Sequence, residues 1–185
     1  MAGISQDLKL ARFVEGRSPA ASGTVIWKPR TLEFTMTTYL ANDAAPDGLV
    51  TSARCVVLRD GEVLVVTDRD GVMHIVPGGR REPGETLVET ARREVREETG
   101  LDLIRLEQIG VMLYEHLTPR PREYSYPYPH FIQVVFVATS PAGADVECDD
   151  EWAASAGFMD VTSAHEIVPD SQRPLLDAAL RAIHR

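Results

Sequence analysis

The chain has 185 residues, 44% of them hydrophobic, which is enough for one domain with an ordinary core, and no apolar run approaches the ~20 residues of a membrane span. Its formal net charge of −9 argues against a nucleic-acid polymer as a partner, because such binding depends mainly on Lys and Arg. Since the chain does not start with a basic and apolar leader, we expect a soluble cytoplasmic protein with no membrane partner.

Residues 1–50 are expected to form an N-terminal β extension ahead of a domain over residues 51–185. Residues 24–27 and 31–38 are β-rich and flank the turn residues 28–30, which predicts a hairpin. The sequence leaves two arrangements open. The extension either packs on its own subunit or forms a swapped arm of a homodimer.

The next segment predicts a second hairpin and then a glycine-rich approach to a helix. Residues 54–58 and 62–67 are β-rich and flank Asp60-Gly61, a strong two-residue hairpin signal. A short apolar run over residues 73–76 is followed by Pro77, Gly78 and Gly79. These glycines leave a backbone that a metal ion or an anionic ligand can approach closely.

Residues 86–99 are predicted to form one amphipathic helix. Thr86 and Glu89 have the spacing of a capping box, and Gly100 stands where a left-handed helix stop is expected. At about 100° per residue, one apolar stripe is predicted to face the core. It consists of Leu87, Val88, Ala91 and Val95.

The remaining elements complete a layered α/β chain. Residues 108–117 and 131–139 read as strands, and the second is apolar enough for the middle of a sheet. The proline-rich residues 119–130 between them are expected to form an extended surface loop. A helix over residues 169–184 closes the chain. This order predicts an α/β/α sandwich with a mixed β-sheet, plus the N-terminal β extension.

Three carboxylates of the predicted helix need a cation. Glu94, Glu97 and Glu98 fall at the margin of the apolar stripe and crowd the helix end that favours positive charge. Two such charges ~5 Å apart repel by roughly 3 kcal/mol at an effective dielectric near 20. Hard oxygen ligands without nearby Cys or His select Mg²⁺ or Mn²⁺, and Mg²⁺ implies a phosphate ligand. The alternative, a solvated face with ion pairs, is accepted only for Glu89 with Arg92 and Arg93.

The segment from Gly79 to Leu101 resembles the Nudix box of the Nudix hydrolases at every defining position. The matching residues are Gly79, Glu85, Arg93, Glu94, Val95, Glu97, Glu98, Gly100 and Leu101. So many fixed positions within one window make coincidence an unlikely explanation of the match. The strand and helix order from about residue 53 onward is also similar to the family's fold.

The resemblance implies a reaction and assigns roles to residues. Glu94, Glu97 and Glu98 would act in catalysis as metal ligands, the backbone near Gly79 would add a further metal contact, and Arg93 would pair with Glu85 to hold the box together. Water would attack one phosphorus of a diphosphate linkage with the help of Mg²⁺ or Mn²⁺. The partner would be a small-molecule nucleotide diphosphate substrate.

Outside the box, an acidic cluster and a tyrosine-rich loop are further candidates. Relatives often place another catalytic carboxylate after the box, and Glu151 is our first choice within the acidic residues 147–151. The alternative is a solvated acidic loop. Three tyrosines of the loop are candidates for stacking a nucleobase, and packing onto the body is the alternative. They are Tyr124, Tyr126 and Tyr128. His130 is the histidine worth testing, whereas Trp27 and Trp152 are expected to pack in the protein.

Three functions follow in order of preference. The first is a Mg²⁺-dependent hydrolase of a nucleoside diphosphate linked to another moiety, of the nucleotide-sugar, ADP-ribose or dinucleotide type. The second is a MutT-like nucleoside triphosphate pyrophosphohydrolase, which would release pyrophosphate. The third is a Nudix-fold nucleotide sensor without catalysis. Sensors of this kind generally lose box carboxylates, and this chain keeps them.

Overall fold

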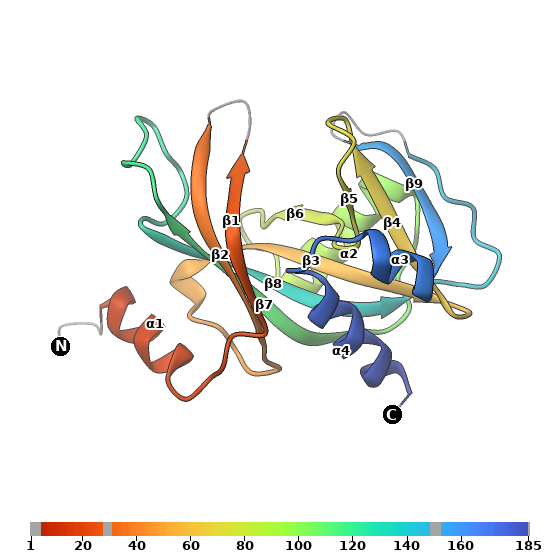
Figure 1. The fold of residues 1–185 in the computed structure, drawn as a ribbon, viewed down its shortest axis with the longest axis horizontal. Helices are drawn as coiled ribbons and strands as arrows, with labels where there is room; N and C mark the ends of the chain where they lie inside the picture. The colour runs from red at the N-terminus through yellow and green to blue at the C-terminus, as the bar shows by residue number, and fades with distance from the viewer. Residues whose placement is uncertain (1–4, 28–30, 149–152, 185) are drawn as a thin grey trace.

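The computed structural model describes residues 5–27, 31–148 and 153–184 (Figure 1). The helices are α1 (Gln6–Val14), the short 3-10 helix η1 (Asp47–Leu49), α2 (Leu87–Thr99), α3 (Val161–Ile167) and α4 (Arg173–Ile183). The strands are β1 (Ala21–Trp27), β2 (Leu32–Leu40), β3 (Val50–Arg59), β4 (Glu62–Asp68), β5 (Met73–His74), β6 (Gly78–Arg80), β7 (Leu106–His116), β8 (His130–Thr139) and β9 (Ala153–Asp160). Within these ranges, no helix combines the length and apolar character needed to cross a membrane.

The described strands form one mixed sheet in the order β1-β2-β7-β8-β3-β4-β5, with β6 paired to β3 and β9 paired to β4. β8 pairs in parallel with β3 and antiparallel with β7. Its interior position confirms the prediction from its apolar sequence. The side chains of β8 are buried along nearly its whole length, as expected for a strand covered on both faces.

Helices cover both faces of this sheet, which confirms the predicted α/β/α arrangement (Figure 1). On one face, α3 and α4 bury Ala164, Leu175 and Leu176 against the strands. On the other face, Ala91 and Val95 of α2 pack into a second core, to which α1 also contributes. Helix α2 therefore lies against β3 and β6, and its carboxylates meet the strands there.

The hairpin predicted at Asp60-Gly61 is confirmed. Leu58 pairs with Val63 and Arg59 pairs with Glu62, which leaves a two-residue turn. Asp60 and Gly61 both have positive φ, 49° and 85°, as this kind of hairpin turn requires. The turn fixes the register of β3, which contributes Arg54 to the cleft described below.

The N-terminal strands continue the main sheet. β1 and β2 form the predicted hairpin, with Trp27 opposite Leu32, and β2 pairs with β7 from Phe34 to Leu40. The extension thus packs on its own chain, and a homodimer with a swapped arm stays a prediction. Phe34, fully buried, joins the core shared with α4.

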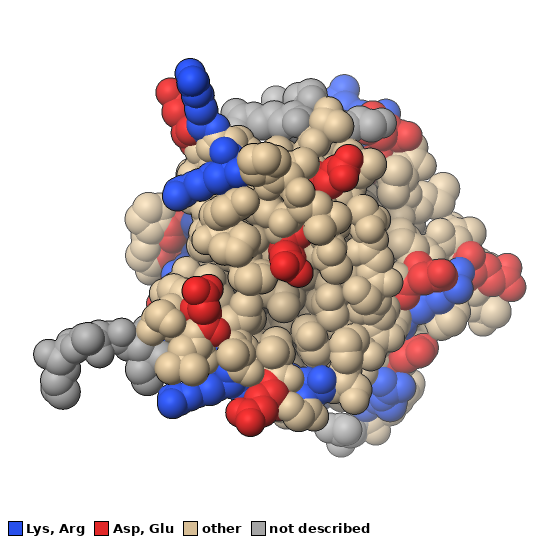
Figure 2. Space-filling model, turned by 60° about the vertical axis from the view of Figure 1, so that its left-hand side comes forward, with Lys and Arg blue, Asp and Glu red and all other residues tan. Residues whose placement is uncertain are grey.

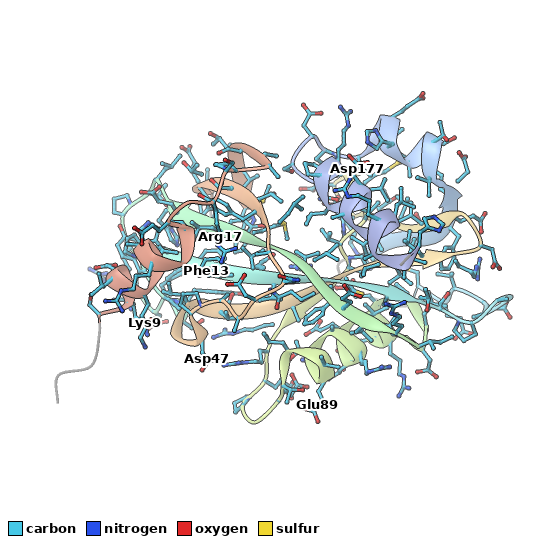
Figure 3. The ribbon with its side chains drawn as sticks, turned by 90° about the horizontal axis from the view of Figure 1, so that it is seen from below. Lys9, Phe13, Arg17, Asp47, Glu89 and Asp177 are labelled. Carbon is cyan, nitrogen blue, oxygen red and sulfur yellow. The ribbon has the colours of Figure 1, made fainter. Side chains whose placement is uncertain are left out.

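Some elements were not predicted, and one helix begins later than expected. The sequence did not indicate α1, η1, α3, β9 or the short strands β5 and β6. The C-terminal helix starts at Arg173 rather than at residue 169, because residues before it form a turn and Pro174 stands in its first turn. Arg17 follows α1, and its guanidinium carbon lies 4.5 Å from the ring centroid of Phe13 in that helix (Figure 3). Arg17 also forms an ion pair with Asp43 at 2.6 Å.

Candidate active site

Helix α2 is defined by its own sequence at both ends. The Thr86 side chain accepts a hydrogen bond from Glu89 N at 3.2 Å, and the Glu89 carboxylate accepts one from Thr86 N at 2.8 Å, so the predicted capping box is present. Gly100 ends the helix in the left-handed conformation with φ 71°. Glu89 therefore caps the helix on its outer side (Figure 3) instead of pairing with Arg92 or Arg93 as predicted.

The buried face of α2 differs from the predicted stripe at one position. Ala91 and Val95 are fully buried as predicted, but Val88 is 40% exposed. The fully buried Thr90 takes its place toward the core, where its hydroxyl group donates to Glu85 Oε2 at 2.9 Å. Because that hydroxyl has a partner, its burial carries no unpaired polar group. This orientation of the helix brings Glu94 and Glu98 to the sheet side.

The glycine pair of β6 lies directly against these carboxylates. Gly78 and Gly79 pair with Arg54 and Ala53 of β3. The Gly78 amide donates to Glu98 Oε2 at 3.1 Å. A β-carbon built on Gly79 would lie 2.3 Å from Glu94 Oε2, so only glycine leaves room for that carboxylate. The structure thus brings together three residues predicted for one site, Gly79, Glu94 and Glu98.

Arg93 holds the loop before α2 to the helix. Its Nε and Nη2 atoms donate to the two carboxylate oxygens of Glu85 at 2.7 and 3.0 Å, the pairing that the resemblance implied. This contact is the main reason why the pKa of Glu85 is lowered to about 2. Arg93 Nη2 also donates to the Arg80 carbonyl oxygen at 3.0 Å, which links the helix to β6.

The same arginine also neutralises part of the carboxylate cluster. Arg93 Nη1 donates to Glu94 Oε1 at 2.9 Å and to Glu97 Oε2 at 3.0 Å. Glu94 is partly buried, which raises its pKa. The side chain of Glu97 is 56% exposed and lies with Arg93 toward the outer surface of α2. The structure therefore places Glu94 and Glu98 in the cleft and leaves Glu97 bound to Arg93 at its edge.

A cleft with a volume of ≈ 550 Å³ opens beside the glycine pair. It is lined by Trp27, Ser52, Arg54, Val66, Asp68, His74, Gly78, Gly79, Arg80, Glu94, Glu98, Tyr126, Gln133 and Ala153. Sequence reasoning found the glycines, the glutamates and Tyr126. It missed Arg54, His74 and Gln133, which come from separate strands that meet only in the folded sheet. Alternation along β3 could have indicated an inward arginine, but not the cavity that it faces.

Two of the missed residues give the floor of the cleft its polarity. Arg54 Nε donates to Gln133 Oε1 at 3.3 Å, and the positive charge of Arg54 also acts on Glu94, where it opposes the effect of burial on the pKa of that carboxyl group. His74 also lines the cleft, and its buried Nδ1 has no hydrogen-bond partner among the described residues. Burial, with the charge of Arg54 as a smaller cause, lowers the pKa of His74 to about 4. At neutral pH this part of the cleft therefore offers a guanidinium group and a neutral imidazole to a ligand.

The three loop tyrosines have different surroundings. Tyr126 lines the cleft, and the Arg80 guanidinium carbon lies 4.8 Å from its ring centroid. Tyr124 is buried, and its hydroxyl group lies 2.5 Å from His116 Nε2. Tyr128 is 41% exposed and is not among the residues of the cleft. Only Tyr126 is therefore placed where it can meet a ligand bound at the carboxylates.

The remaining candidates lie away from the described cleft or outside the described residues. Glu151 belongs to residues 149–152, which the structure does not describe. Its described neighbour Glu147 donates its backbone N–H to the Thr99 carbonyl oxygen at 3.0 Å, at the C-terminal end of α2. His130 Nε2 lies 3.8 Å from Glu115 Oε1, and His130 does not line the cleft.

The residues around Gly79 fit a hard divalent cation. Within the described ranges, no three His, Cys, Asp or Glu side chains are already arranged around a metal position. However, the bare backbone of Gly79 against the carboxylate of Glu94 leaves oxygen atoms without a side chain between them. Carboxylate and backbone oxygens are the donors that Mg²⁺ and Mn²⁺ prefer. Glu97 could join them only by turning away from Arg93.

Comparisons with known proteins identify relatives of this chain. The chain is 27% identical over 142 residues to an ADP-ribose pyrophosphatase of Methanocaldococcus jannaschii, covering 75% of this chain and 74% of that protein. It is 29% identical over 122 residues to the NAD-capped RNA hydrolase NudC of Pectobacterium atrosepticum, covering 63% of this chain but only 42% of the relative. The second match therefore concerns less than half of the NudC protein.

The fold also has solved counterparts. The structure of a Bacillus subtilis pyrophosphohydrolase superposes with a TM-score of 0.54 at 18% identity, covering 86% of this chain and 96% of the other. At that identity the likeness shows the fold alone. The model of the NUDIX domain matches residues 49–179, which include the glycine pair, the Arg93 network and the carboxylates of α2. This chain belongs to the Nudix family.

Proposed function

We propose that the protein is a divalent-metal-dependent hydrolase that cleaves the diphosphate linkage of a nucleoside diphosphate joined to another moiety. The carrying observation is the contact of Glu94 and Glu98 with the glycine pair at one end of a cleft. Family membership supports the reaction class. The named activity of the archaeal relative, of which the chain covers 74%, supports a substrate of the ADP-ribose type.

In this proposal, Glu94, Glu98 and the backbone of Gly79 hold Mg²⁺ or Mn²⁺, and Glu97 joins them after leaving Arg93. The ion, when bound, supplies positive charge to the diphosphate and makes water a better nucleophile. Arg93 and Glu85 position the helix relative to β6, as their paired contacts indicate. No covalent intermediate with the protein is needed for such a displacement.

Two arginines and a tyrosine of the cleft support an anionic substrate with a ring. Arg54 and Arg80 both line the cleft. Their guanidinium groups can donate to phosphate oxygens in pairs. Tyr126 offers an aromatic face beside Arg80. On the face of the molecule in Figure 2, acidic and basic side chains of the described residues are interspersed and form no continuous basic surface. A small phosphorylated molecule fits these features better than a nucleic-acid polymer.

The test of the reaction is product identity in millimolar Mg²⁺. Candidate substrates are nucleotide sugars, ADP-ribose, NADH, dinucleoside polyphosphates and nucleoside triphosphates, with products separated by mass. The proposal expects a nucleoside monophosphate and the phosphorylated partner from one diphosphate-linked class. Release of pyrophosphate from triphosphates would instead establish the MutT-like activity. Tight nucleotide binding without hydrolysis in either metal would support the sensor.

Glu98→Gln tests the site directly. Loss of even an outer partner of a bound metal costs 10–100-fold, so removing a ligand charge is expected to lower kcat/KM by more than roughly 100-fold. Glu89→Gln is the matched control, because it lies on the same helix and a glutamine can keep the capping box. An active Glu98→Gln protein with a normal melting temperature would contradict the proposed site.

Glu151 is proposed as the additional carboxylate, acting as a general base from the acidic residues 147–151. Loss of a general base typically lowers the rate by roughly 100- to 10,000-fold. We expect Glu151→Gln to lower kcat with little change in KM, and Glu147→Gln, from the same acidic segment, to remain active. Equal activity of both variants would favour a solvated acidic loop.

A further inference from the structure

A tryptophan of the N-terminal hairpin forms part of the cleft, although the family match begins only at residue 49. Trp27 is the last residue of β1, opposite Leu32 of β2. The hairpin is held in place because β2 pairs with β7 of the main sheet. A segment outside the matched region thus contributes a wall of the candidate active site.

Trp27 has a packed side and a side toward the cleft. Its ring centroid lies 4.7 Å from that of Phe34, 5.4 Å from that of Tyr114 and 5.5 Å from that of Phe131. These core residues confirm the expectation that Trp27 packs in the protein. Yet the side chain is only partly buried and also lines the cleft. The core contacts restrict the motion of the ring, so its remaining surface is a fixed wall.

A series of neighbouring residues connects the carboxylates to Trp27. Glu94 lies against Gly79, and Arg80 follows Gly79 in β6. The Arg80 guanidinium carbon is 4.8 Å from the ring centroid of Tyr126, and that ring is 6.2 Å from the ring of Trp27. The order along the cleft is therefore acidic, cationic and aromatic. A nucleotide carries a metal-binding diphosphate at one end, a polar, uncharged sugar in the middle and a planar base at the other end, so its diphosphate matches the carboxylates and arginines and its base matches the aromatic rings.

We propose that Trp27 is a specificity-determining residue that, with Tyr126, contacts the planar base of a nucleotide whose diphosphate lies at Glu94 and Glu98. The two rings make an interplanar angle of 68°, so a base lying flat on one ring meets the edge of the other. Stacking of this kind accepts any base. The inference rests on the proposed function and extends it, because the N-terminal hairpin then selects for substrates that carry a base.

Two non-hydrolysable ligands test this inference in the presence of Mg²⁺. One is α,β-methylene-ADP, and the other is methylenediphosphonate, which keeps the two phosphorus atoms but lacks the base and sugar. Dissociation constants are measured for Trp27→Leu, which keeps apolar volume without an aromatic face, and for Trp27→Phe, which keeps a ring. Ile26→Leu is the control, because Ile26 is 55% exposed and neighbouring residues of a strand point to opposite faces.

Trp27→Leu is expected to weaken binding of α,β-methylene-ADP by roughly 5- to 150-fold, the range found for removal of one stacking side chain. Binding of methylenediphosphonate should stay within twofold of wild type, and Trp27→Phe should recover most of the loss. Equal weakening of both ligands would assign Trp27 a structural role and overturn the inference, as would an unchanged affinity for both. Either result leaves the proposed function standing if wild type hydrolyses a diphosphate-linked substrate. A wild-type protein that binds neither ligand and hydrolyses no such substrate would overturn both proposals.

Discussion

The carboxylate of Glu94 occupies the space that a side chain at the position of Gly79 would need. A β-carbon on Gly79 would lie 2.3 Å from Glu94 Oε2 and 2.5 Å from its carboxyl carbon. The neighbouring Gly78 is constrained differently, since a β-carbon there would meet the backbone of β3. The two glycines therefore make different demands, one on the carboxylate site and the other on the fold.

Gly79→Ala is expected to lower activity far more than stability. The added methyl group displaces a flexible carboxylate end rather than backbone, so the fold can adapt while Glu94 leaves its position. We expect kcat/KM to fall by more than roughly tenfold, the lower limit for disturbing partners of a bound metal. Gly23→Ala is the control, because nothing lies within 4 Å of its added carbon. Unchanged activity of Gly79→Ala would show that Glu94 need not stay there.

Gly78→Ala should instead lower the free energy of unfolding. Gly78 has φ 130°, and its added carbon would lie 2.3 Å from the Ala53 carbonyl oxygen and 2.9 Å from the Arg54 α-carbon. A strained conformation combined with a backbone clash costs more than about 2 kcal/mol of unfolding free energy. Urea denaturation measures this loss. A variant with wild-type stability would mean that β6 can separate from β3 without cost.

Arg93→Met should make the melting temperature less dependent on pH in the acidic range. The contact with Arg93 is the largest of the causes that lower the pKa of Glu85 from its ordinary 4.5 to about 2, so its stabilising effect is complete above pH 4.5 and is lost as the pH falls toward 2. The melting temperature of wild type should therefore fall more steeply over that interval than that of Arg93→Met. Arg96→Met is the control, since Arg96 pairs with Asp102 on the exposed surface. Parallel curves for wild type and Arg93→Met would contradict this assignment.

Tyr124→Phe is expected to lower stability without changing catalysis. The substitution leaves His116 Nε2 without the tyrosine hydroxyl group, while His116 Nδ1 is already buried without a hydrogen-bond partner in the part of the chain that the structure describes. An unsatisfied buried group costs about 1–3 kcal/mol. Thermal melting and steady-state kinetics separate the two effects, with the exposed Tyr128→Phe as the control. A fall in kcat/KM at full stability would place Tyr124 in substrate binding.

The His116 environment adds a pH dependence to the same comparison. Burial lowers the pKa of His116 below its ordinary 6.5, so the folded chain takes up the proton less readily than the unfolded chain. The sign follows from linkage. Stability is unaffected by this group above pH 6.5 and declines as the pH falls below that value.

Local sequence signals predicted the parts of the fold that depend on neighbouring residues. The ends of α2 follow from Thr86 and Gly100, and the β3–β4 hairpin follows from Asp60-Gly61. These features are encoded within a few positions, because caps and tight turns satisfy their own backbone groups or backbone geometry. The Arg93–Glu85 pair was instead implied by the resemblance to the Nudix box, and the structure contains it.

The residues that line the cleft could not all be predicted, because contacts between distant parts of the chain bring them together. Val88 was wrongly assigned to the buried face, because the core contacts of α2 turn Thr90 inward. His74 and Trp27 reach the cleft from different strands. Tyr124 and Tyr126 are two residues apart in one loop, yet one is bound to His116 and the other faces the cleft. Such differences are set by the packing of the whole sheet.

The pairing of β2 with β7 also has a consequence for the order of folding. These strands lie far apart in the chain, and contacts between distant segments must overcome loop-closure entropy before they stabilise anything. Helix α2 carries its own cap and stop, so it can begin to form locally. Helix α2 can therefore begin to form before the β2–β7 contacts that place Trp27 beside the cleft.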